Sequence, residues 1–220
     1  MTIAKTMLPE KATARLESLC QGDHAYLTAD ERLVLFRHFH AGGAQLGDAM
    51  YYAAREGYAE LVEAMLDAGC VPEPVVFRIA FNYGRYEAMV SLARVGHLVD
   101  PAQKEQWLDQ ATCQGRPMGW QKLLIESYGA SVNCFGENDT TPLIEACRRA
   151  DDALSLYLIE QGADIDAHAP EKWCARAYAK RFREHMPLTW ARIARHELTR
   201  KASTARRRRE GVNDEIRRAM

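Results

Sequence analysis

The sequence lacks the features of several large classes of protein. None of its 6 cysteines belongs to a C-x-x-C pair, and their wide spacing fits neither a zinc site nor a dense disulfide framework. Residues 1–20 contain no uninterrupted apolar segment of the kind found in signal peptides. No stretch approaches the roughly 18 apolar residues that a membrane span needs. We therefore expect reduced thiols, no membrane span and a cytoplasmic location.

Motifs of catalysis and cofactor binding are also missing. Three cysteines fall near expected turns, but no motif supplies the histidine and the oxyanion site that a nucleophilic thiol needs. Gly42 and Gly43 lack the following Lys-Ser/Thr of a phosphate-binding loop. His38 and His40 would diverge by about 200° on a helix, because each residue turns by about 100°. We expect no catalytic residue, no metal ligand and no cofactor, and hence a protein that is not an enzyme.

Net charge is nearly absent, at -1 over 220 residues, but the charges are unevenly distributed. Residues 1–170 carry 14 Lys and Arg against 24 Asp and Glu, whereas residues 171–220 carry 15 against 6. The long N-terminal part is therefore acidic and the C-terminal part basic. These two parts attract different ligands.

A complete helix-turn-helix unit lies between Thr141 and Ala167. Thr141 can cap a helix through its hydroxyl, and Pro142 suits the first helical position, where its missing N–H costs nothing. Gly162 supplies the left-handed residue that ends the second helix. The apolar positions recur at three- and four-residue spacing: Leu143, Ala146 and Cys147, then Leu154, Tyr157 and Leu158. Such a unit cannot bury its apolar face alone, so we expect stacked copies.

Three further stretches, residues 49–70, 76–96 and 107–133, repeat this pattern. The first alanines of the four units are separated by 27, 31 and 35 residues, close to a period of about 33. These alanines are Ala53, Ala80, Ala111 and Ala146. On these motifs the chain closely resembles the ankyrin-repeat family. The resemblance implies an all-α solenoid of about four to five helix-turn-helix repeats, with capping helices at the N- and C-terminal ends.

Three regions follow from this pattern. Residues 1–47 are expected to form N-terminal capping helices, because Thr28 and Glu31 make a capping box but no Thr-Pro-Leu is present. Residues 48–198 form the expected ankyrin-repeat domain, whose fifth unit closes it with a second helix beginning at Pro187. The third unit carries two extra residues before Gly129. Residues 199–220 have little apolar content and are expected to be a basic, flexible tail.

The resemblance also implies a site and a function. In the family, residues between the paired alanines and the following glycine line a concave face that binds partner proteins. The equivalent residues here are Arg55, Glu56, Asn82, Tyr83, Cys113, Gln114, Arg148, Arg149, Arg181 and Phe182. We therefore expect a non-enzymatic protein-protein interaction module whose partner protein is unknown. Its role is a stoichiometric inhibitor, such as a bacterial or phage immunity or anti-defence protein, or an effector.

The basic run Arg206, Arg207, Arg208 and Arg209 leaves three interpretations open. It is a solvated tail, a contact with a partner protein or with this chain's own acidic part, or a polyanion-binding site. The last interpretation gives the alternative function, a nucleic-acid-associated protein that uses its basic C-terminal tail.

Overall fold

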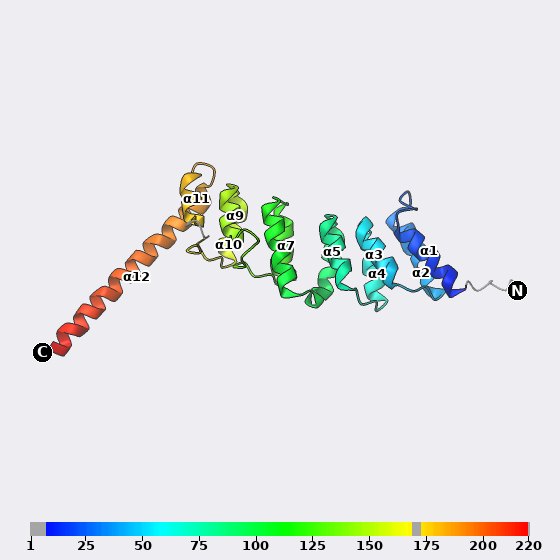
Figure 1. The fold of residues 1–220 in the computed structure, drawn as a ribbon, viewed down its shortest axis with the longest axis horizontal. Helices are drawn as coiled ribbons and strands as arrows, with labels where there is room; N and C mark the ends of the chain where they lie inside the picture. Colours follow the sequence, from blue (N-terminus) through cyan, green and yellow to red (C-terminus); the bar gives the residue numbers. More distant parts are fainter. Residues whose placement is uncertain (1–7, 169–172, 220) are drawn as a thin grey trace. The chain divides into compact units, whose positions relative to one another are not determined.

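The chain folds almost entirely into helices (Figure 1). The computed structural model describes residues 8–168 and 173–219, with side chains for 8–168 and 173–206. Within these residues no strand forms, and a single isolated bridge joins His168 to Cys174. The all-α prediction is confirmed. Two compact units share the chain: residues 1–107 with 122–129, and residues 108–121 with 130–220.

Helices of the first unit pack in two layers. The elements are α1 (Pro9–Cys20), α2 (Ala29–Ala41), α3 (Gly47–Glu56), α4 (Ala59–Asp67), α5 (Pro74–Asn82), α6 (Tyr86–Leu92) and the 3-10 helix η1 (Ala93–Leu98). In one layer α3 packs on α1 and α5, and in the other α4 packs on α2 and α6. The predicted capping box between Thr28 and Glu31 is present at the start of α2. The two N-terminal helices thus cover the end of the stack.

The repeated alanines have a specific structural task. In each of the four repeats identified from the sequence, the residue after the left-handed turn donates its backbone N–H to the carbonyl of the first alanine, at 2.8 to 3.0 Å. The donor and acceptor pairs are Tyr58 with Ala53, Arg85 with Ala80, Arg116 with Ala111, and Asp151 with Ala146. All four alanines are fully buried. This hydrogen bond ends the first helix of these four repeats in the same way, so that equivalent residues lie at each helix end.

The third repeat accommodates its extra length by a π-helix. After α7 (Pro101–Cys113) and α8 (Met118–Lys122), the backbone of η2 (Leu123–Ser127) makes wider turns that hold more residues than α-helical turns do. Tyr128 follows and is buried, and its hydroxyl donates to the Met89 carbonyl at 2.8 Å. Gly96, expected to end a helix, instead lies against this ring, because a Cβ there would be 2.9 Å from Tyr128 Cδ1.

The second unit contains α9 (Pro142–Arg148), α10 (Asp152–Glu160), α11 (Ala175–Arg181) and α12 (Pro187–Ala219). The predicted cap is confirmed, since the Thr141 side chain accepts from Ile144 N and Pro142 opens α9. Helix α9 packs on α10 and α11, and α12 packs on α10 and α11.

Helix α12 is anchored at its beginning. The Asp152 carboxylate accepts the backbone N–H groups of Leu188 and Thr189, at 3.1 and 2.8 Å. Ile193 is buried, but the side chains of residues 198–206 are exposed. The helix begins at Pro187 as predicted and continues without a break for 33 residues, through position 198. The division of the chain at residue 199 stays a prediction.

Candidate interaction surface

The ten residues expected to bind a partner occupy equivalent positions in five helix ends. They form five pairs, and each pair lies where the first helix of a repeat ends. The pairs are Arg55 and Glu56 at the end of α3, Asn82 and Tyr83 at the end of α5, Cys113 and Gln114 at the end of α7, Arg148 and Arg149 at the end of α9, and Arg181 and Phe182 at the end of α11. We call these residues the ladder. Its first four members belong to the first unit and its other six to the second unit. Their use as a binding site stays a prediction.

In the first unit the ladder combines aromatic rings with an ion pair. Arg55 Nε lies 2.8 Å from Glu56 Oε1, and the Arg55 guanidinium lies 5.2 Å from the centre of the Tyr52 ring. Tyr83 is 56% exposed and Asn82 is also exposed. Exposed tyrosine beside arginine is a combination that often anchors protein interfaces.

Arg148 in the second unit is held by a buried carboxylate. Its Nε and Nη2 atoms lie 2.8 and 2.5 Å from the two oxygens of Glu145, whose side chain is only 2% exposed. A buried carboxylate without its partner is strongly destabilising. Arg148 therefore stabilises the fold, and part of its hydrogen-bonding capacity is already used.

Arg149 is exposed and, among the described residues, forms no ion pair with a carboxylate. Its Nη1 donates a hydrogen bond to the Cys113 carbonyl of the preceding repeat at 3.1 Å. This contact lies beside Gly115, where an added Cβ would collide with the guanidinium. In the next repeat Arg181 is exposed, with its guanidinium 5.5 Å from the centre of the Phe182 ring. The second-unit part of the ladder is therefore positively charged.

The surroundings of Cys113 disfavour its thiolate form. Burial, followed by the nearby carboxylates of Asp109 and Glu145, raises the pKa of its thiol to about 12. Its Sγ lies 3.6 Å from Asp109 Oδ1, where the thiol can donate. A protonated thiol is unreactive at neutral pH. This supports a structural interpretation of Cys113.

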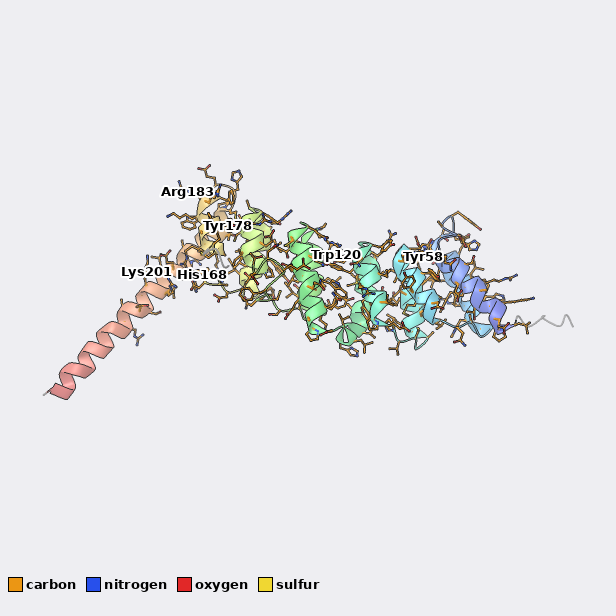
Figure 2. All side chains as sticks on the ribbon, viewed as in Figure 1. Tyr58, Trp120, His168, Tyr178, Arg183 and Lys201 are labelled. Atoms are coloured by element: carbon orange, nitrogen blue, oxygen red, sulfur yellow. The ribbon has the colours of Figure 1, made fainter. Side chains whose placement is uncertain are left out.

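Sequence reasoning missed several residues that support the ladder. Tyr52 lies three residues before Arg55 and hence on the same helix face, which is the pattern that could have revealed it. Arg85 Nε donates to the Arg55 carbonyl at 2.7 Å. Arg116 Nε donates to Gln114 Oε1 at 3.0 Å, and its guanidinium lies 4.7 Å from the centre of the Trp120 ring. Trp120 is labelled in Figure 2.

The weaker candidate, the run Arg206 to Arg209, lies within α12. Arg206 is exposed, and the side chains of the other three arginines lie outside the described residues. Among the described residues, no cluster of His, Cys, Asp or Glu could hold a metal ion, and no helix is long and apolar enough to cross a membrane. All six cysteines are free thiols.

Comparison with known proteins identifies the architecture. No protein-family model and no curated protein matches the sequence. The ankyrin repeat protein EF0377 has a similar structure, with a TM-score of 0.56, 17% identity, and coverage of 81% of this chain and 97% of that chain. A structure of the predatory endopeptidase Bd0816 from Bdellovibrio bacteriovorus in complex with the immunity protein Bd3460 gives a TM-score of 0.52 and 14% identity, covering 82% of this chain and 96% of the matched chain.

Proposed function

From its ankyrin-repeat fold we propose that the chain is a non-enzymatic module that binds a partner protein through the ladder. The observation that carries this proposal is the repeated helix end, which presents two residues of every repeat at an equivalent position. In the first four repeats a hydrogen bond to a buried alanine fixes the backbone at this position, so the starting points of the side chains are set before binding. Preorganised contact residues reduce the entropy lost on association.

The charge of the second-unit ladder indicates what it binds. Arg149 and Arg181 are exposed, and no ion pair joins either of them to a carboxylate within the described part of the chain. We propose that this part contacts an acidic region of the partner, since guanidinium groups bind carboxylates with two parallel hydrogen bonds. In the first unit, Tyr83 and the Tyr52–Arg55 pair would supply the aromatic contacts.

The proposed role is that of a stoichiometric inhibitor. One structure of similar fold comes from a complex of an endopeptidase with an immunity protein. By analogy, this chain would bind and inactivate an enzyme, as an immunity or anti-defence protein of a bacterium or phage does. A role as an effector is the other possibility that the fold supports. The six free thiols support the cytoplasmic location included in the proposal.

The test has two stages. A tagged chain is first used to isolate its partner from the native lysate, and the affinity of the purified pair is then measured by calorimetry. Changing Arg149→Glu together with Arg181→Glu should weaken binding by a few kcal/mol, because interface arginines are frequent hot spots. Both residues are exposed, so the melting temperature should change little.

The matched control is Arg37→Glu, which reverses an exposed charge on α2. Affinity that falls equally in the control and the ladder variant would show a general charge effect and contradict the proposed site. If the partner is an enzyme, the unaltered chain should inhibit it at a one-to-one ratio and the ladder variant should not. Arg148 is left unchanged because its loss would unpair Glu145.

Nucleic-acid binding is the second candidate function. It is favoured by the concentration of basic residues on α12, which is separate from the ladder. The two candidates are distinguishable because they use different residues and different ligands.

A further inference from the structure

One face of α12 carries a stripe of basic and hydroxyl side chains. The stripe consists of Arg192, Arg195, His196, Thr199, Arg200 and Thr204. Each of them lies three or four positions from another member, so the six together occupy about half of the helix circumference, and all six are exposed. The stripe contains no carboxylate and no large apolar side chain.

A recess of about 460 Å³ lies at the start of the stripe, between α12 and the turn Gly162–Ile165 after α10. Arg192, Arg195, His196 and Thr199 line it from the side of α12. Beyond Thr199 the hollows along the stripe are lined by α12 alone, so the stripe there is an open helix face. From Arg192 to Thr204 the stripe extends over roughly 18 Å, at about 1.5 Å per residue.

Positive charge in the first turns of the stripe is not neutralised. No ion pair joins Arg192 or Arg195 to a carboxylate among residues 8–168 and 173–206. Arg200 Nη1 lies 3.3 Å from Asp166 Oδ2, but Asp166 also pairs with Arg176. Asp164 in the neighbouring turn lines the recess without pairing with either free arginine.

The hydroxyl side chains leave space between the arginines. Thr199 Oγ1 donates to the Arg195 carbonyl at 3.1 Å, and Thr204 Oγ1 donates to the Arg200 carbonyl at 2.9 Å. Both threonines are therefore held against the helix. Their hydroxyl hydrogens are used within the helix, so the donors left for an anion are the neighbouring guanidinium groups.

We infer that this stripe binds the phosphate backbone of a nucleic acid, and that the contact begins at Arg192 rather than at the run Arg206 to Arg209. The inference rests on the second candidate function and is independent of the ladder. Arginine side chains are frequent phosphate contacts. A protein interface would instead need a buried aromatic or aliphatic anchor, which the stripe does not offer.

The test measures the salt dependence of binding to labelled nucleic acids by fluorescence anisotropy. Duplex DNA, duplex RNA and single-stranded RNA are titrated between about 50 and 200 mM salt. Changing Arg192→Gln together with Arg195→Gln should make the log-log slope less steep by roughly 2, because each phosphate contact contributes about 0.9. Circular dichroism verifies that the variant keeps its helix content.

The matched control is Lys180→Gln with Arg183→Gln, which removes two exposed positive charges from the same unit. Figure 2 shows Arg183 at the end of α11, away from Lys201 on α12. This control should leave the slope unchanged. An equal loss in the control would mean that only total charge matters and would overturn the inference.

A third variant changes all four arginines from 206 to 209 to glutamine. If this variant abolishes nucleic-acid binding while the stripe variant binds normally, the inference is wrong and the run Arg206 to Arg209 is the binding site. If the unaltered chain binds none of the nucleic acids at about 50 mM salt, both the inference and the second candidate function fail. Competition by polyglutamate as effective as that by nucleic acid would overturn the inference in favour of an acidic polypeptide.

Discussion

Replacing Ala150 by glycine should stabilise the chain. Ala150 has a φ of 56°, in the left-handed region, at the turn position that Gly57, Gly84 and Gly115 occupy in other repeats. The left-handed conformation costs an L-residue about 1–2 kcal/mol. Glycine gains freedom in the unfolded chain, which reduces the benefit by about 0.4–1 kcal/mol. The difference predicts a net stabilisation of roughly 0.5–1 kcal/mol.

The assay is thermal and urea unfolding of the Ala150→Gly variant beside the reverse change, Gly57→Ala. For a chain of this size, a gain of 1 kcal/mol raises the melting temperature by about 2–4 °C. Gly57→Ala should destabilise the chain, because it introduces strain at a φ of 88° and places a Cβ 2.9 Å from Arg85 Cδ. Unchanged or lower stability of Ala150→Gly, with the expected loss in Gly57→Ala, would refute the strain at Ala150.

Two further predictions concern α12. Asp152→Ala should destabilise the second unit by about 1–2 kcal/mol in urea unfolding, since it removes the carboxylate that accepts from Leu188 N and Thr189 N, whereas Glu160→Ala should have no comparable effect. Deleting residues 199–220 should change the melting temperature by only a few degrees, because the side chains of 199–206 are exposed and each of the two lost surface ion pairs, Arg200 with Asp166 and Lys201 with Glu197, contributes about 0–1 kcal/mol. A cooperative collapse of the truncated chain would show that this segment supports the fold.

The repeat architecture could be predicted because its determinants are local. A cap at Thr141, a proline after it and a buried alanine four residues later specify a helix through contacts within that helix. The same holds for the capping box of Thr28 and Glu31. The positions of the ladder residues followed from the repeat alignment, since in the first four repeats they lie at a helix end that the alanine hydrogen bond defines.

Contacts between elements could not be predicted in the same way. Gly96 has the spacing of a helix-ending glycine, but its lack of a side chain leaves room for the ring of Tyr128, 32 positions later. The interaction of Asp152 with the start of α12 joins residues 36 and 37 positions apart. Arg148 and Glu145 are only three residues apart, but the burial of Glu145 by the fold, which gives their ion pair its importance, is not a local property of the sequence.

In the basic C-terminal part of the chain, arginines that are adjacent in the sequence and arginines that share a helix face are different sets of residues. Four adjacent arginines stand out in a linear sequence, yet adjacent residues on a helix turn by about 100° each and cannot all face one ligand. Arg192, Arg195 and Arg200 are separated by other residues and attract little notice, but their spacing gathers them on one face. Because α12 continues through these positions, the charge on one face of the helix determines where an anion can bind. On that basis the basic surface begins inside the expected repeat domain, where deletion of residues 199–220 would leave Arg192 and Arg195 in place.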